Sequence, residues 1–187
     1  GFNFNDLSGP TFNGSDDIQI DSFTFGGACS IEVYFYITQH MQYGRIIDFA
    51  SSAGGGDNVI IRVDGQKTVF QFRAGSNNAV QTVVTGSTTI NLNTWYHAIV
   101  TVTSSGSIEG YVDTVDQGIN AKFNAGSGVP TVTRNVNYVG DDTWNTANAQ
   151  HLNGKMSFVR IWHGHVLSSS EISSLYNNRD LIANDKT

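Results

Sequence analysis

The segment from Asn93 to Val112 constrains the fold most, because its residues alternate between two faces. Two sets of residues alternate there, which is the period-two signature of a β-strand: Tyr96, Ala98, Val100 and Val102 on one face, and His97, Ile99, Thr101 and Thr103 on the other. Ser104-Ser105-Gly106 has the composition of a turn, and the alternation resumes from Ile108 to Val112. The segment therefore predicts a β-hairpin.

The same signal recurs along the whole chain, between turns rich in Gly, Asn and Asp. Asp64-Gly65 predicts a two-residue hairpin turn. We find no linker and no internal repeat in the 187 residues, and we expect one domain, 1–187. Many strands in such a chain predict an all-β, two-sheet antiparallel sandwich. Besides the hairpin, the expected strands cover residues 18–20, 31–37, 44–50, 59–63, 69–73, 82–90, 136–139 and 155–162.

One helix is expected near the C-terminus, over about residues 168–178. Ser168 and Glu171 have the spacing of a capping box, in which each side chain satisfies a backbone N–H of the first turn. Ile172, Leu175 and Tyr176 follow on one helical face, and Asn177-Asn178 is expected to end the helix. We expect this helix to dock on the sandwich.

Charge and cysteine content exclude several classes of protein. The formal net charge is −6 and the ten Lys and Arg residues are scattered, which argues against nucleic-acid binding and against binding to anionic membranes. No apolar run approaches the length of a membrane span, so we expect no membrane insertion. Cys29 has no partner for a disulfide within the chain and is interpreted as a small buried hydrophobe, with a reactive thiol as the alternative.

Several segments, in one order, carry a resemblance to a known family. The chain resembles the laminin G-like, pentraxin-related jelly-roll domain of the concanavalin A-like lectin/glucanase superfamily, and the likeness covers nearly its whole length. It implies a jelly-roll sandwich that acts in extracellular recognition, often of glycans and often with Ca²⁺. The segments are 12–20, 30–35, 44–49, 57–61, 93–97, 137–140, 152–162 and 167–176.

The resemblance also implies a calcium site. In calcium-binding members an Asp just before the strand after the Gly-rich loop holds the ion, and Asp57 matches that position. The family's backbone carbonyl corresponds to Ala74, and its Asn corresponds to Asn135 or Asn137. Calcium takes oxygen ligands, which all of these residues supply. The alternatives are that Asp57 only caps a turn, or that the pairs Asp16-Asp17 or Asp141-Asp142 hold the ion.

A loop after the strand at 136–139 has the composition of a sugar site. Sugar sites combine an aromatic face with carboxylate and carboxamide groups that bond hydroxyls. We therefore take four residues as candidate ligand-binding residues, with the alternative that the tryptophan folds back onto the edge of the sandwich: Asp141, Asp142, Trp144 and Asn145.

The pattern and the resemblance also predict one ion pair and the positions of three tyrosines. Arg45 and Asp48 fall within the family's frame and are expected to form a structural ion pair. Tyr34, Tyr36 and Tyr111 lie on the strand faces opposite the core, where they either line a concave sheet or pack against the terminal helix.

No catalytic group is evident in the sequence. The three glutamates, Glu32, Glu109 and Glu171, have no acidic neighbour at the spacing that a glycoside hydrolase of this fold would need. There is no Gly-x-Ser-x-Gly motif. His163-Gly164-His165 has no third ligand near it in sequence and is interpreted as a solvated turn.

These observations predict a non-catalytic recognition or adhesion module. Its partner would be a glycan or glycoprotein, bound through rim loops with the help of Ca²⁺, and it would act outside the cell or on a cell or particle surface. The alternative is a structural or assembly domain of a larger surface, filament or virion protein, which mediates protein–protein contacts.

Overall fold

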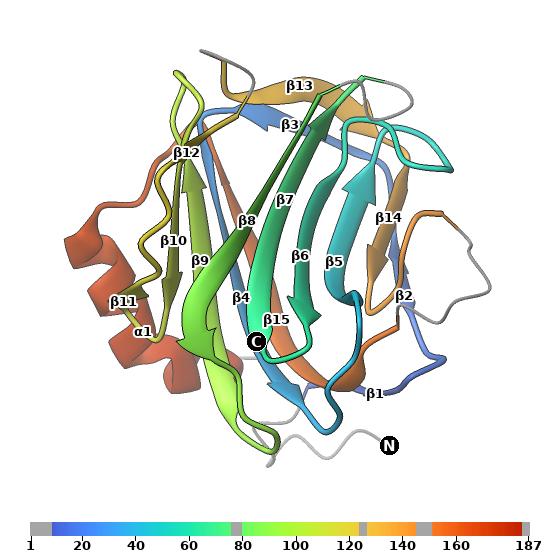
Figure 1. Cartoon of the computed structure of the whole chain (residues 1–187), viewed down its shortest axis with the longest axis vertical. Helices are drawn as coiled ribbons and strands as arrows, with labels where there is room; N and C mark the ends of the chain where they lie inside the picture. Colours follow the sequence, from blue (N-terminus) through green and yellow to red (C-terminus); the bar gives the residue numbers. More distant parts are fainter. Residues whose placement is uncertain (1–8, 76–79, 124–126, 145–150, 185–187) are drawn as a thin grey trace.

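A computed structural model describes residues 9–75, 80–123, 127–144 and 151–184. Two antiparallel sheets form a sandwich (Figure 1). The first sheet has the order β1-β15-β4-β9-β10-β11, with β12 paired to β10. Its strands are β1 Thr11–Asn13, β4 Cys29–Ile37, β9 Trp95–Val102, β10 Ser107–Val112, β11 Val115–Asp116, β12 Ala121–Lys122 and β15 Asn153–His163.

The second sheet has six strands in the order β2-β14-β5-β6-β7-β8. They are β2 Ile18–Ile20, β5 Gly44–Ala50, β6 Val59–Asp64, β7 Lys67–Ala74, β8 Val80–Thr89 and β14 Val136–Val139. A separate pair, β3 Phe23–Gly27 and β13 Val129–Arg134, crosses one end of the sandwich, at the top of Figure 1. The all-β, two-sheet sandwich with one C-terminal helix is confirmed.

The predicted alternation places the core between the sheets. Ile31, Val33 and Phe35 of β4 and Ile61 and Phe70 of the second sheet belong to one buried apolar cluster. The hairpin of β9 and β10 forms as predicted, with Val100 opposite Gly110. Burying alternate apolar side chains is the main stabilising term of such a sandwich.

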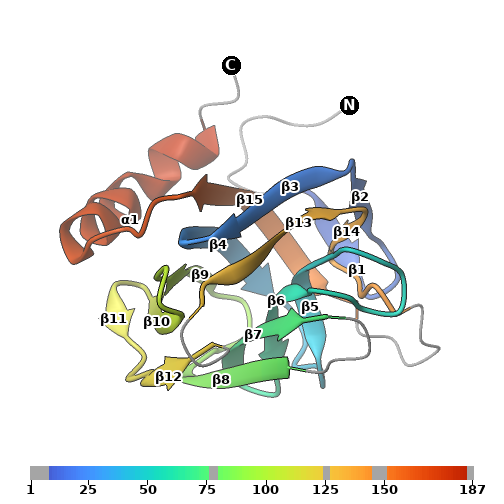
Figure 2. The same cartoon turned by 90° about the horizontal axis from the view of Figure 1, so that it is seen from above.

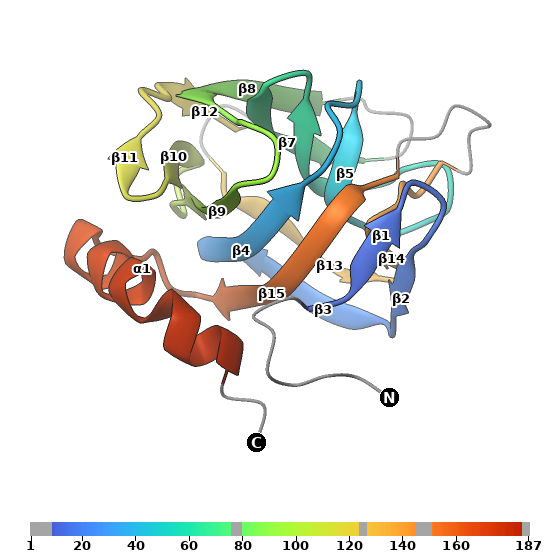
Figure 3. The ribbon, with the colours of Figure 1, turned by 90° about the horizontal axis from the view of Figure 1, so that it is seen from below.

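The helix α1, Ser169–Asn184, covers the outer side of the first sheet (Figures 2 and 3). A second apolar cluster joins Ile99 of β9 to Leu167 and Ile172. Tyr34 is buried there and donates a hydrogen bond from its hydroxyl to Asp180 Oδ1 at 3.1 Å. Of the two alternatives for Tyr34, the structure therefore selects packing against the helix.

The predicted end of the helix is wrong. The helix continues without interruption beyond Asn178 to Asn184. The Nδ2 of Asn178 donates to the carbonyl of Ser174, four residues earlier, at 2.8 Å. The predicted capping box does form: Ser168 N donates to Glu171 Oε2 at 2.8 Å and Glu171 N donates to Ser168 Oγ at 3.3 Å.

The hairpin turn after β6 is shifted by one residue from the prediction. Asp64 pairs with Lys67, so Gly65 and Gln66 form the turn, with Gly65 at a φ of 59°. Cys29 is buried, as expected of a small hydrophobe. In the described part of the chain, no helix has the length and apolar character to cross a membrane.

Candidate functional site

The outer face of the six-stranded sheet carries an unusual set of polar side chains. Val59, Ile61 and Val63 of β6 face the core, so Arg62 between them faces outward. Register places Arg45 of β5 opposite Arg62, and Arg73 near the end of β7 opposite Gln81 of β8. We call Arg45, Arg62 and Arg73 the arginine patch.

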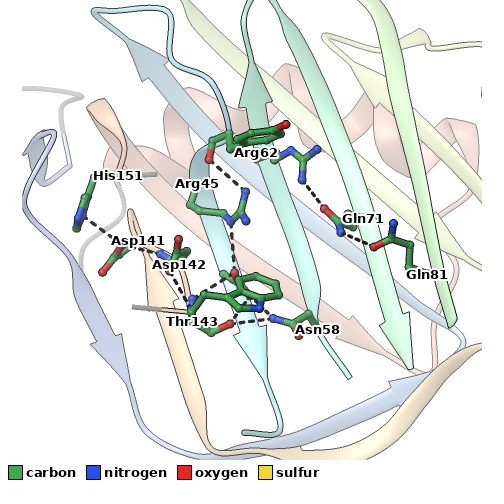
Figure 4. A network of polar contacts seen from close by, with 12 residues as sticks. Arg45, Asn58, Arg62, Gln71, Gln81, Asp141, Asp142, Thr143 and His151 are labelled. Atoms are coloured by element: carbon green, nitrogen blue, oxygen red, sulfur yellow. Dashed lines mark hydrogen bonds and ion pairs between the residues drawn. The ribbon is translucent and has the colours of Figure 1, made fainter. Parts of the chain in front are cut away.

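Asp48, also on β5, is buried at the centre of a polar network on this face. Figure 4 labels three of its partners, Arg45, Asn58 and Thr143. Asp48 Oδ2 lies 3.3 Å from Arg45 Nε, which confirms the predicted structural pair. Its Oδ1 accepts a hydrogen bond of 2.6 Å from Asn58 Nδ2, which also donates to Thr143 Oγ1 at 3.0 Å. The network ties the sheet to the loop that follows β14.

Burial dominates the electrostatics of Asp48. It raises the pKa of the carboxyl to about 6, although Arg45, Asn58 and the backbone N–H of Thr143 favour the charged form. The desolvation cost of the buried carboxylate therefore exceeds the stabilisation that its ion-pair and hydrogen-bond partners give to the charged form.

Trp144 is held against the sheet by this loop. Its ring contacts the guanidinium of Arg73, with 4.4 Å from Cζ to the ring centroid, and that of Arg45 at 5.6 Å. A Cβ on Gly55 would lie only 2.3 Å from the indole, so the ring packs directly on this glycine. The ring is half-buried, which combines both sequence alternatives: Trp144 folds back onto the sandwich and keeps part of its surface in solvent.

Two other candidate ligand-binding residues of this loop hold Trp144 in place. Asp142 is buried, and its Oδ1 accepts a hydrogen bond of 2.9 Å from Trp144 N. Asp141 Oδ1 accepts one of 2.7 Å from Asp142 N and lies 3.3 Å from His151 Nδ1. Asn145 lies outside the described residues. Asp142 thus fixes the backbone beneath the ring, a role that the sequence did not suggest.

Three of the four candidate calcium ligands lie around Ser51. Asp57 Oδ2 accepts from Ser51 Oγ at 2.9 Å, and its Oδ1 accepts from the backbone N–H of Gly75, next to Ala74, at 2.7 Å. Asn135 Nδ2 donates to the Ser51 carbonyl at 3.2 Å. Asn137 lies elsewhere: it is buried, and its Nδ2 donates to the carbonyls of Asp21 and Arg134.

This group of oxygens contains a single carboxylate. Both oxygens of Asp57 accept hydrogen bonds that close the turn, as the capping alternative requires. In the segments described, no three His, Cys, Asp or Glu side chains gather as a metal site. These oxygen ligands suit a hard cation such as Ca²⁺, but a single carboxylate provides little negative charge for tight binding.

Sequence reasoning missed the polar ladder that extends the arginine patch. Arg62 Nη1 donates to Gln71 Oε1, and Gln71 Nε2 donates to Gln81 Oε1 at 3.3 Å, as Figure 4 shows. The ring of Tyr43, 40% exposed, lies 4.9 Å from Arg62 Cζ. A single strand shows only one member of this ladder, so the register had to be known to find it.

A second missed network lies under α1. Glu32 Oε1 lies 2.5 Å from His97 Nε2, and Arg160 Nε donates to Glu32 Oε2 at 2.6 Å. Burial raises the pKa of Glu32, but the hydrogen bonds from His97 and Arg160 outweigh it and the pKa is lowered. Glu32 and His97 are buried, with the Tyr176 ring of α1 packed on His97, so this network helps to anchor the helix.

Solved structures with the same architecture include carbohydrate-binding domains. Domain 4 of AbnA, an extracellular arabinanase from Geobacillus stearothermophilus, solved with arabinotriose, matches with a TM-score of 0.65 and 18% identity, over 89% of this chain and 75% of that one. A SAP-like pentraxin from Limulus polyphemus matches with a TM-score of 0.64 and 13% identity, over 89% and 80%.

The CBM40 of the Ruminococcus gnavus IT-sialidase, solved with α2,3-sialyllactose, matches with a TM-score of 0.65 and 8% identity, over 87% and 97%. At these identities the likeness shows the fold. No curated protein sequence matches this chain. A family model described as "Concanavalin A-like lectin/glucanases superfamily" (Laminin_G_3) matches residues 12–173. The chain therefore belongs to the concanavalin A-like lectin/glucanase superfamily, in its laminin G-like branch.

Proposed function

We propose that this chain is a non-catalytic, extracellular carbohydrate-binding module, and that it binds glycans on the outer face of its six-stranded sheet, beside Trp144. The observation that carries the proposal is the Asp48–Asn58–Thr143 network, which holds a half-exposed indole on a face rich in hydrogen-bonding groups. An aromatic surface covers the C–H side of a sugar ring, while fixed polar groups select its hydroxyls.

The neighbours support this reading. The arabinanase domain and the sialidase module were solved with arabinotriose and sialyllactose, and both are binding domains of larger enzymes or proteins. The rest of this face supplies complementary polar groups, among them the exposed Gln81 and the guanidinium of Arg73. Glycan or glycoprotein is therefore the proposed partner.

We also propose a calcium ion at Asp57, with the carbonyl of Ala74 and the side chain of Asn135 as further oxygen ligands. The support is the convergence of these segments on Ser51 and the family relationship to laminin G-like domains. The ion would supply a Lewis-acidic centre on the rim of the sandwich. Asn137 remains a candidate from the sequence, with its side chain turned to Asp21 and Arg134.

The test is a glycan array probed with the purified chain, followed by calorimetric titration of the bound glycans. We expect Trp144→Ala to weaken binding by about tenfold or more, since a buried aromatic contact is worth on the order of 1.5 kcal/mol or more. Trp95→Ala is the matched control, because Trp95 packs against Tyr34 and Tyr36 within the other sheet.

Binding that survives Trp144→Ala but is lost in Trp95→Ala would move the site to the first sheet. An array without any bound glycan would overturn the proposal. In that case self-association, measured by analytical ultracentrifugation, would favour the assembly alternative.

A further inference from the structure

The arginine patch brings three cations together on a protein of net negative charge. Arg45 and Arg62 stand directly opposite each other on β5 and β6, and Arg73 follows at the far end of β7, against the indole of Trp144. Arg45 is buried, Arg62 is nearly so, and Arg73 is half-exposed. A soluble ligand would therefore meet Arg73 first.

Carboxylates contact two residues of the patch. Asp48 contacts Arg45 at 3.3 Å, and Asp64 lies 3.6 Å from Arg62 Nη2. The Nε of Arg62 is buried without a hydrogen-bond partner in the described structure. The three guanidinium groups share one face of the sheet, and an anion placed against them would reduce their mutual repulsion.

The acid–base properties of the patch agree with this geometry. Burial lowers the pKa of Arg62, and the nearby charge of Arg45 lowers it further. Burial also lowers the pKa of Arg73, and both Arg45 and Arg62 act in the same direction, against Asp48. The three guanidinium groups thus act on one another electrostatically, on the face where we place the glycan.

The groups around the patch suit a sugar rather than an inorganic anion. Gln71 and Gln81 form a carboxamide ladder beside the guanidinium groups, with Gln81 exposed. Tyr43 and Trp144 place an aromatic ring at each end of the patch, stacked on Arg62 and Arg73. Planar guanidinium groups match the geometry of a carboxylate, and carboxamides match hydroxyls.

We propose that the arginine patch selects acidic saccharides: the carboxylate of a uronic or sialic acid binds at Arg73, backed by Arg62, and the sugar's hydroxyls bind at the exposed Gln81, which the buried Gln71 holds in place. This inference rests on the proposed glycan-binding function and names its ligand class. The preference of this face for acidic saccharides is thereby assigned to residues of β6, β7 and β8.

The test compares saccharides that differ in their carboxylate. The probes are α2,3-sialyllactose against lactose, and trigalacturonic acid against galactotriose, titrated by calorimetry, alongside an array that carries sialylated, uronate and neutral glycans. We expect the acidic member of at least one pair to bind about tenfold or more tightly, as a charge-assisted hydrogen bond provides. Its affinity should fall when NaCl is raised from about 0.05 M to about 0.5 M, because salt screens the attraction.

The key variant is Arg73→Gln, which should remove the preference for the acidic probe. Arg73→Lys keeps the charge but loses the planar fork, and should retain part of the preference. Lys155→Gln is the matched control, because it removes a half-buried cation that lies against Tyr36 on the other sheet. It should leave the preference intact. Far-ultraviolet circular dichroism and melting temperature establish that each variant is folded.

The outcomes separate the two proposals. Equal affinity for acidic and neutral probes, or an array that retains only neutral glycans, overturns the acidic specificity and leaves the glycan-binding function standing. The same holds if Arg73→Gln and Lys155→Gln lower the affinity equally. An array that retains no glycan overturns the proposed function itself.

Discussion

Asp48 shows how one buried carboxylate can organise the outer face of a sheet. It is fully buried, yet it reaches Arg45 in its own strand, Asn58 just before β6 and Thr143 in the loop after β14. A buried ionised group is stable only when its hydrogen-bonding capacity is used, so these contacts fix one another's positions. The loop that carries Trp144 is thereby held in one arrangement without a ligand.

The raised pKa of Asp48 predicts a specific pH dependence of stability. An unfolded aspartate has a pKa of about 3.9, and in the folded protein the value is raised to about 6, chiefly by burial. Between these values the folded state binds more protons than the unfolded state. The contribution of Asp48 to the free energy of unfolding therefore falls as pH rises from about 4 to about 6.

This contribution is measured by urea unfolding of the wild type and Asp48→Asn at several pH values. We expect the stability of the wild type relative to the variant to decrease across the window from pH 4 to pH 6 and to level off above it. A difference that is constant with pH would show that Asp48 titrates with its ordinary pKa.

Gly55 and Gly54 give a matched pair of substitutions next to Trp144. Both have positive φ, 85° and 80°, so alanine costs similar backbone strain at either position, on the order of 1 kcal/mol. A Cβ on Gly55 would meet the indole at 2.3 Å, whereas a Cβ on Gly54 meets nothing within 4 Å. We expect Gly55→Ala to displace Trp144 and to abolish glycan binding, and Gly54→Ala to retain it.

Tryptophan fluorescence and calorimetric titration check this expectation. The emission of Gly55→Ala should shift to longer wavelength as the indole becomes more exposed, whereas Gly54→Ala should keep the wild-type spectrum. If both variants bind glycan like the wild type, the position of Trp144 does not control the site.

At the level of elements, the sequence predicted what depends on local periodicity and missed what depends on register. Alternation located β4, β6 and β9, and the capping box located the start of α1. The structural pair of Arg45 and Asp48 was also expected, because the family resemblance places both residues within its frame. The family resemblance, not the alternation, supplied the jelly-roll class.

The arginine patch could not be derived from the sequence in the same way. Its guanidinium groups come from three strands, and an irregularity between Arg45 and Ile47 shifts the alternation of β5, so that Ile46 and Ile47 are both buried. A bulge of this kind breaks the period-two pattern from which faces are assigned. The support of Trp144 by Asp142 depends likewise on a loop conformation that residue types alone do not specify.

The N-terminus of α1 predicts a second pH dependence, of opposite sign to that of Asp48. Hydrogen bonds from Ser168 and His165 lower the pKa of Glu171 to about 2. A carboxyl with a lowered pKa stabilises the fold above its unfolded pKa, about 4.3, and this contribution is lost as pH falls from there towards 2.

Thermal melts of the wild type and Glu171→Gln between pH 2 and pH 7 test this. We expect the wild type to melt at a higher temperature at pH 7 and the difference to shrink below about pH 4. Glu109→Gln, which removes an exposed carboxylate from β10, is the control. A difference that persists unchanged at pH 2.5 would mean that the ionised Glu171 is not what stabilises the helix start.

At the scale of the molecule, the two sheets have different tasks. The outer side of the first sheet is occupied by α1, which rests on Ile99, Tyr34 and the Glu32–His97 pair. In Figures 2 and 3 no helix or strand of the described part covers the outer side of the second sheet. Recognition on that second face therefore requires no rearrangement of the helix.

The calcium proposal also belongs to this scale, because a bound ion stabilises the whole folded domain. A ligand at about a hundred times its dissociation constant adds roughly 2.7 kcal/mol to the free energy of unfolding. For a domain of this size, that raises the melting temperature by roughly 5–10 °C. We expect that rise when the chain is melted in excess Ca²⁺ rather than in chelator. Asp57→Asn should abolish it, since asparagine tolerates the positive φ of 47° but lacks the charge.

Glu109→Gln is the control for a general effect of surface charge, because it removes an exposed carboxylate from β10 of the other sheet; it should keep the calcium-dependent rise. Asp17→Asn tests the rival pair Asp16-Asp17. Asp141→Asn tests the rival pair beside Trp144. A rise that disappears only in Asp141→Asn would move the ion to that loop. Equal melting temperatures of the wild type in Ca²⁺ and in chelator would leave Asp57 with the role that its two hydrogen bonds already give it, closure of the turn between Ser51 and Gly75.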